Sequence, residues 1–455
     1  ADAKHKAEVI LRRGVDDSQA NKRRKIAEAS LKWRIEYIKS REKFIEEVFE
    51  KANKELENLV RSEKYSEIVK NLILDALSVL DSGEYEILIA GDTSVNIDLE
   101  ELSRLSKEKF GIEIEVIGVP FAEVYPKIME DLTTATGKYD ILTFPPFYNG
   151  DFMGGGWLVP MDDYMKKWPV AFEDIIPGFR ELYCKWGGHV YALTYDGDYR
   201  MMYFRYDLFT DEKLRAKFKE MFGYDLPIPT PEKPITWEQA IDLAKFFTKK
   251  YNPDSPTEYG TALYGFKDLT YAWWTDIFAS MGGIYWDWDF KPLINTDIGV
   301  KALEIMCELA KYSPPGVAKF GYEELKNVFL EGKVAWVVQW PCVGKKMNDP
   351  ALSKIVGKGR CAPAPAYKDP KTGELRTANN MKWGRVLAIS KFCKHPEAAY
   401  RLIAWMNSPE QSILYVANPK TGLDPFRYSH MDPERFGKVF KEATGVEFPA
   451  LDNYL

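Results

Sequence analysis

The chain has 455 residues, of which 45% are apolar and 14% aromatic. That length exceeds one ordinary hydrophobic core and the apolar content excludes a disordered protein, so we expect two or more folded lobes. The formal net charge of −6 gives no overall electrostatic reason to bind nucleic acid or an anionic membrane surface.

Residues 22–80 are predicted to form a long, highly charged helix. Seven apolar side chains recur at helical spacing and form a narrow stripe: Ile35, Ile38, Ile45, Phe49, Leu56, Leu59 and Val60. Because charge fills the other faces, this helix buries little surface alone and needs a partner helix or a docking surface. A solvated extension that folds back on the main body is the alternative interpretation.

After Ser82 and Gly83 the pattern changes to short strands that alternate with helices. We expect strands at 85–92, 112–120 and 139–147, and helices at 99–111 and 121–137. Alternation of this kind predicts a parallel sheet covered by helices. In such sheets ligands bind beyond the carboxyl ends of the strands.

The stretch YALTYDGDYRMMYFRYDLF, residues 191–209, mixes apolar, aromatic and acidic residues. Gly197 would interrupt an amphipathic helix, and a plain buried strand would not place Asp196 and Asp198 next to aromatic rings. We therefore expect a strand that ends at a binding site. A bound cation and a capped turn at Gly197 are the alternatives for these two carboxylates.

The N-terminal residues resemble a known family. The stretch AEVILRRGVDDSQANKRRKIAEASLKWRIEYIKSREKFIEEVFEKANKEL, followed by SEKYSEIVKNLILDAL, is similar to the E-type subunits that form the peripheral stalk of archaeal-type and vacuolar-type ATPases. The resemblance covers about residues 4–80. It implies a helical partner for residues 1–83 and a fusion of two sequences, and a stalk or scaffold protein is one functional alternative.

A second resemblance covers about residues 84–430. Segments such as GGGWLVPMDDY, ITWEQAIDLAKFF, FLEGKVAWVVQWPCVGKKM and TGLDPFRYS occur in the order found in extracellular solute-binding proteins of ABC transporters, the group that carries sugars. This resemblance implies an α/β, two-lobed periplasmic-binding-protein-like fold, here with an N-terminal long-helix extension. It implies capture of a sugar, in our expectation an oligosaccharide, by hinged closure and delivery to an ABC permease outside the cell or in the periplasm. No catalysis, cofactor or metal is implied.

The resemblance also implies limits for the lobes. Residues 84–194 and about 364–405 would form lobe one, and about 205–363 with 406–455 would form lobe two. Residues 1–83 would remain a helical extension. The ligand would favour the closed state by contacting both lobes.

The expected ligand contacts follow from the shape of a sugar. Its hydroxyl rim needs polar partners, and its flat C–H faces stack on aromatic rings. By their motif positions Asp196 and Asp198 would accept from hydroxyl groups, and Trp340 and Trp383 would stack. The further candidates are Trp273, Trp274, Asp276, Tyr148, Asn149, Gln339 and Arg385. Only one of two adjacent helical tryptophans can face a given side.

A glycoside-active enzyme is the third functional alternative. Glycosidases also combine tryptophans with two carboxylates about 5–10 Å apart, a separation that sequence spacing does not reveal. Against an enzyme stand the missing P-loop, G-x-S-x-G and metal-ligand histidine motifs. The five cysteines likewise lack metal-ligand spacing.

Overall fold

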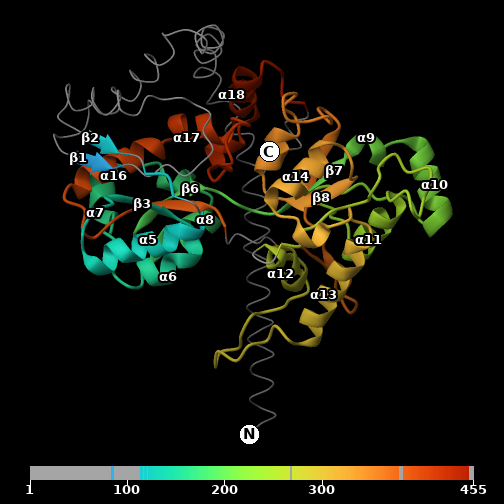
Figure 1. Cartoon of the computed structure of the whole chain (residues 1–455), viewed down its shortest axis with the longest axis horizontal. Coiled ribbons are helices and arrows are strands. Elements are labelled where there is room, and N and C mark those ends of the chain that lie inside the picture. Colours follow the sequence, from blue (N-terminus) through green and yellow to red (C-terminus); the bar gives the residue numbers. More distant parts are fainter. Residues whose placement is uncertain are drawn as a thin grey trace. The chain divides into compact units, whose positions relative to one another are not determined.

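In the computed structural model of the chain, the described residues are 84–86, 113–115, 117–119, 121–266, 269–378 and 383–449. They belong to two compact units (Figure 1). Unit 1 contains residues 199–380, and unit 2 contains the described residues up to 198 together with 383–447. The predicted helices at 22–80 and 99–111 lie outside the described residues.

Unit 2 is built on a sheet of three strands in the order β3-β12-β6. Their bounds are β3 (Ile141–Phe144), β6 (Ala192–Asp196) and β12 (Arg385–Ile389). The central strand β12 is antiparallel to both neighbours, and nearly every residue of the sheet is buried. The prediction of a parallel sheet is therefore wrong here, because a strand from far along the chain inserts between β3 and β6. Only the pair β1 (Glu84–Glu86) and β2 (Glu113–Glu115) is parallel among the described strands.

Helices pack on each strand of this sheet. The helix α5 (Phe121–Thr134) contacts β3, α8 (Pro177–Tyr183) contacts β6, and α16 (Pro396–Met406) contacts β12. The prediction of a helix from 121 and a strand near 139–147 is confirmed by α5 and β3. Val124, Ile128 and Leu132 recur every four residues on α5 and are buried, which explains its docking.

The remaining elements of unit 2 are short or lie near the C-terminus. They are η1 (Pro146–Tyr148), α6 (Asn149–Phe152), α7 (Asp162–Lys167), η2 (Phe172–Asp174), β4 (Lys185–Trp186), β5 (His189–Val190), α17 (Pro409–Val416), η4 (Tyr428–Met431) and α18 (Pro433–Thr444). The helices α17 and α18 both contact η4. A bridge between Ile175 and Arg427 joins this region to the segment before α8.

Unit 1 is built on a second antiparallel sheet of order β8-β7-β9. The strands are β7 (Met201–Arg205), β8 (Trp336–Gln339) and β9 (Gly359–Pro363), and the larger helices are α10 (Glu212–Phe222), α11 (Trp237–Phe246), α12 (Thr270–Ser280), α13 (Asp297–Ala310) and α14 (Tyr322–Leu330). The helices α12 and α13 lie side by side (Figure 1). A capping box between Thr236 and Gln239 starts α11.

Short elements complete unit 1. They are α9 (Tyr206–Phe209), η3 (Val317–Lys319), α15 (Cys342–Lys346), β10 (Tyr367–Lys368) and β11 (Leu375–Arg376). Among the described helices of either unit, none is both long and apolar enough to cross a membrane.

The boundary between the units falls between Asp198 and Tyr199, after the predicted end of lobe one at 194 and before the predicted start of lobe two at about 205. Residues 409–444, however, group with unit 2 through their contacts with η4, whereas the predicted lobe two includes residues from 406 onward. The predicted lobe limits stay a prediction.

Candidate functional site

Asp196 is the last residue of β6 and lies opposite Arg385, the first residue of β12. A guanidinium nitrogen of Arg385 donates to Asp196 Oδ2 at 3.1 Å. The backbone N–H of Asp424 donates to Asp196 Oδ1 at 2.7 Å. With 3% of its surface exposed, Asp196 is a buried carboxylate, and the Arg385 cation and the Asp424 backbone N–H stabilise it.

The turn after Asp196 fits closely against two other loops. Asp198 Oδ2 accepts from the backbone N–H of Gly384 at 2.8 Å, and the N–H of Gly197 donates to the carbonyl of Asp424 at 3.1 Å. A Cβ atom at Gly197 would lie 2.3 Å from the carbonyl oxygen of Pro425, which explains the glycine. Both carboxylates therefore accept from loops that are distant in sequence, and their predicted roles as hydroxyl acceptors, cation ligands or turn caps stay predictions.

Asp424 joins the two predicted carboxylates. Ligand oxygens of Asp196, Asp198 and Asp424 all lie within 4.8 Å of one another. Asp424 was not among the predicted residues, although the TGLDPFRYS segment that contains it was one of the resembling segments. Burial, together with the negative charges of Asp198 and Asp196, raises the pKa of Tyr183 well above its usual value. Tyr183 is therefore neutral at physiological pH and keeps a hydroxyl proton that it can donate.

Trp383 lies just before Gly384, beside another aromatic ring. Its ring meets that of Phe147 edge-on at a centroid distance of 5.6 Å. Phe147 is 43% exposed, and its ring also contacts Tyr148 at 4.4 Å. Sequence reasoning missed Phe147, although it is the last residue of the predicted strand at 139–147. These rings form an aromatic surface at the carboxyl end of β3.

Asn149 and Tyr148 differ in their surroundings. The Asn149 side-chain amide donates to the carbonyls of Leu182 and Tyr183, so it ties the start of α6 to the end of α8. Tyr148 packs against Tyr125 at a centroid distance of 4.6 Å. Both residues have clear structural roles, and ligand contact by either stays a prediction.

In unit 1, Asp276 pairs with an arginine that was not among the predicted residues. Arg200 Nε donates to Asp276 Oδ2 at 2.9 Å, and both side chains are at most 1% exposed. The guanidinium carbon lies 5.1 Å from the ring centre of Tyr264, 5.2 Å from that of Trp340 and 5.9 Å from that of Trp273. Three rings therefore surround a buried ion pair. The only sequence signal was a charged residue directly before the apolar residues 201–204 of β7.

Gln339 and Trp340 follow each other at the end of β8. Gln339 Oε1 accepts from the backbone N–H of Trp340 at 3.0 Å and from the hydroxyl of Tyr264. The Tyr264 and Trp340 rings lie 5.2 Å apart at an interplanar angle of 30°. The structure thus brings together four predicted residues, Asp276, Trp273, Gln339 and Trp340, around Arg200.

The two adjacent tryptophans of α12 face different ways, as helical geometry requires. Trp273 is fully buried and lies near the ring of Trp336 at 6.2 Å. Trp274 stacks on Phe278 at 4.4 Å, and its indole N–H donates to the carbonyl of Gly299 at 3.1 Å. Trp274 therefore packs α12 on α13 and does not join the group around Arg200.

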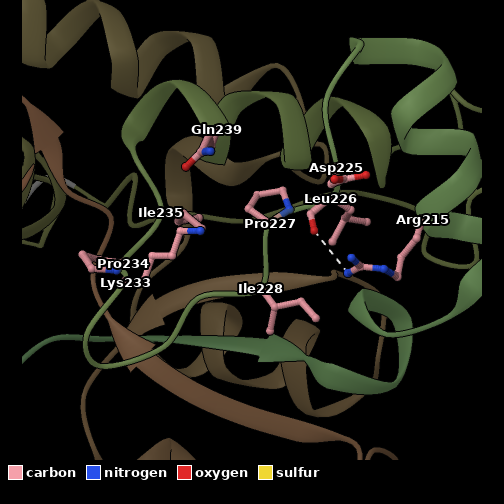
Figure 2. Close-up of a pocket in the computed structure, with 9 residues that line it drawn as sticks. All are labelled: Arg215, Asp225, Leu226, Pro227, Ile228, Lys233, Pro234, Ile235 and Gln239. Atoms are coloured by element: carbon pink, nitrogen blue, oxygen red, sulfur yellow. Dashed lines mark hydrogen bonds between the residues drawn. The ribbon is translucent and has the colours of Figure 1, made fainter. Parts of the chain in front are cut away.

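A surface pocket of about 300 Å³ lies elsewhere in unit 1 (Figure 2). Its lining consists of Arg215, Asp225, Leu226, Pro227, Ile228, Lys233, Pro234, Ile235 and Gln239. A guanidinium nitrogen of Arg215 donates to the carbonyl of Leu226 at 3.2 Å. None of the predicted ligand residues lines this pocket. It is therefore separate from the group around Arg200.

Comparison with known proteins shows what the chain is similar to. A protein named mannitol-binding protein, from Pseudomonas aeruginosa, is 28% identical over 388 residues, which cover 81% of each chain. A solute-binding protein of Agrobacterium radiobacter in complex with ribitol has a TM-score of 0.62 at 24% identity, covering 80% of this chain and 86% of that one. A maltose-bound protein of T. maritima has a TM-score of 0.60 at 23% identity, covering 79% and 86%. These similarities confirm the predicted two-lobed α/β fold.

Two family models match successive parts of the chain. The model for the ATP synthase E/31 kDa subunit matches residues 1–108, which supports the predicted fusion. The model for the bacterial extracellular solute-binding protein matches residues 90–413. Because the second match covers most of the chain, the protein belongs to the bacterial extracellular solute-binding protein family, whose members bind solutes and are not enzymes.

Proposed function

We propose that the chain captures a sugar or a sugar alcohol and delivers it to an ABC permease. The observation that carries this proposal is the group around Trp340, in which an aromatic ring lies beside the buried polar side chains of Arg200 and Gln339. An aromatic platform beside a few fixed polar groups suits a ligand with apolar C–H faces and a hydroxyl rim.

The carboxylates of unit 2 support the same ligand class. Asp196 and Asp198 accept from backbone and guanidinium donors. A carboxylate has about four acceptor sites, so each can also accept from a sugar hydroxyl. Trp383 and Phe147 add an aromatic surface in the same unit. We propose that the ligand uses both sets, with closure of the two lobes as the binding step.

Two ligands of different length are candidates, an oligosaccharide and a single open-chain polyol. An oligosaccharide would use the aromatic surfaces of both units. A single open-chain polyol is the second candidate, and it is favoured by the relative named for mannitol. The proposal also includes delivery to a permease, a location outside the cytoplasm and a helical partner for residues 1–83. The two family matches support these parts.

The test measures binding of mannitol, ribitol, glucose, maltose and maltotriose by intrinsic fluorescence and by thermal melting. A ligand that binds only the folded state raises the melting temperature in a saturable way. Trp340→Ala should abolish that rise. Trp405→Ala, which truncates a half-buried tryptophan of α16, is the matched control and should retain it. A folded wild type that responds to none of these compounds would refute the carbohydrate proposal.

A further inference from the structure

Three nitrogen atoms next to Trp340 are buried without a hydrogen-bond partner in the described part of the chain. They are Nη1 and Nη2 of Arg200 and Nε2 of Gln339. Both side chains are fully buried. A buried donor without an acceptor costs about 1–3 kcal/mol, and more when it is charged, so native proteins rarely keep one without a reason.

The orientation of the Gln339 amide follows from its partners. The backbone N–H of Trp340 can only donate, so the side-chain atom that it contacts is the oxygen, Oε1. The Tyr264 hydroxyl contacts the same oxygen. The nitrogen Nε2 therefore occupies the other side of the amide, and it is the donor that has no partner among the described residues.

The strand register brings these donors to one place. Arg200 immediately precedes β7 and Gln339 is the last residue of β8, and in the antiparallel pair Met201 lies opposite Gln339. Arg200 and Gln339 therefore lie at the same end of two hydrogen-bonded strands. Trp340 follows directly and lies over the Arg200 guanidinium at 5.2 Å. The faces of the nearby rings stabilise the positive charge of the guanidinium.

We propose that Arg200 and Gln339 are ligand-binding residues that donate to neighbouring hydroxyl oxygens of a neutral polyol or sugar stacked on Trp340. This inference rests on the proposed function. Nη1 and Nη2 form a planar fork that matches two acceptor oxygens on adjacent carbon atoms. Of the three rings around Arg200, Trp340 alone has measurable exposure, 6% against 0% for Tyr264 and Trp273. Trp340 is therefore the ring of the three that a ligand can reach.

The ion pair selects the charge of the ligand. Asp276 lies 2.9 Å from Arg200 and neutralises it within an apolar surrounding. An anionic sugar would add a second negative charge beside Asp276, which is unfavourable at low dielectric. A neutral hydroxyl pair takes the two open donors without that cost. The site should therefore discriminate against uronates and sugar phosphates.

The test compares Arg200→Lys with Arg205→Lys by calorimetric titration with mannitol and maltose. The lysine at 200 keeps the positive charge beside Asp276 but loses the fork. Arg205 lies on the same strand, and its guanidinium already makes a bidentate pair with Asp207 at 2.7 and 2.6 Å. We expect Arg200→Lys to weaken binding by about tenfold or more, and Arg205→Lys by less than about twofold, since only the first loses ligand donors.

The outcomes separate this inference from the proposed function. Equal affinity of the wild type and Arg200→Lys would overturn the inference and leave the proposed function intact. Tighter binding of glucuronate than of glucose would overturn the selection of a neutral ligand. No binding of any sugar by the wild type would overturn both.

A second measurement applies if Arg200→Lys does not fold. Deoxy analogues of glucose and mannitol each remove one acceptor, and they are titrated into the wild-type protein. Loss of affinity by about tenfold or more at two adjacent positions supports the paired donors. Unchanged affinity at every position overturns them.

Discussion

The guanidinium of Arg385 lies 3.1 Å from the carboxylate of Asp196, directly across the β12–β6 pair. Arg385→Leu would leave the carboxylate of Asp196 buried beside an apolar side chain. Because the arginine side chain is 30% exposed, we expect a loss of about 2 kcal/mol in the free energy of unfolding, less than for a fully buried pair. Urea titration followed by circular dichroism measures it. Lys167→Leu, which breaks the exposed pair with Glu397, should cost less than about 1 kcal/mol. Equal losses in the two variants would show that the Arg385–Asp196 pair stabilises the fold no more than an exposed ion pair does.

Gly384 should tolerate no side chain. Its φ of +77° is unfavourable for other residues, and a Cβ atom there would lie 2.4 Å from the carbonyl oxygen of Asp196. We expect Gly384→Ala to cost about 3 kcal/mol, since strain and a steric clash add. Gly187, in the same unit, has a φ of +57° and open space around it, so Gly187→Ala should cost about 1 kcal/mol. Thermal melts measure the stability of both variants, of which Gly384→Ala combines backbone strain with a steric clash and Gly187→Ala has the strain alone. A Gly384→Ala variant as stable as Gly187→Ala would contradict the close approach.

The cysteines should differ in reactivity toward iodoacetamide. Burial raises the pKa of Cys184 to about 11 and that of Cys361 to about 12, whereas Cys307 is exposed on α13. Only the thiolate reacts, and a raised pKa keeps the thiol protonated at pH 8. Mass spectrometry after brief labelling should find the modification at Cys307 and almost none at Cys184 or Cys361 until the protein unfolds. Rapid labelling of Cys361 in the folded protein would contradict its burial.

The pocket in Figure 2 should have no part in sugar binding. Ile228→Trp places a large ring in that pocket, on the loop that leads toward α11. Because no residue of the group around Arg200 lines the pocket, we expect the affinity for the sugar to change by less than about twofold. The same titrations measure it. A loss of binding comparable to that of Trp340→Ala would place the ligand in this pocket.

Local sequence patterns predicted those elements whose own residues carry the signal, such as helical spacing or a short apolar run. Examples are the helix from Phe121, the strand that follows it and the end of β6 at Asp196. The parallel arrangement holds for β1 and β2 but is wrong for the sheet of β3 and β6. There β12 pairs with β6 across almost two hundred residues, and local alternation gives no sign of such pairing.

The candidate site also divides into residues that local motifs predicted and residues that only the fold brings together. Motif positions made Asp196, Trp340 and Gln339 candidates for ligand contact, but not Arg200, which lies within the 191–209 stretch. Its importance comes from the ring contacts with Tyr264 and Trp340, which are distant in sequence. Asp424 was missed for the same reason, since its proximity to Asp196 depends on the fold of the C-terminal loops.

The position of β12 also determines the order in which the protein can fold. Unit 2 cannot complete its sheet until residues 385–389 have left the ribosome, whereas residues 199–380 are contiguous and already carry the strands of unit 1. Folding of unit 2 therefore pays for a long-range closure that unit 1 avoids, and it should be the slower step. During synthesis β3 and β6 remain unpaired strand edges, open to aggregation, until β12 has been made. Competence to bind solute is thus a late property of the nascent chain.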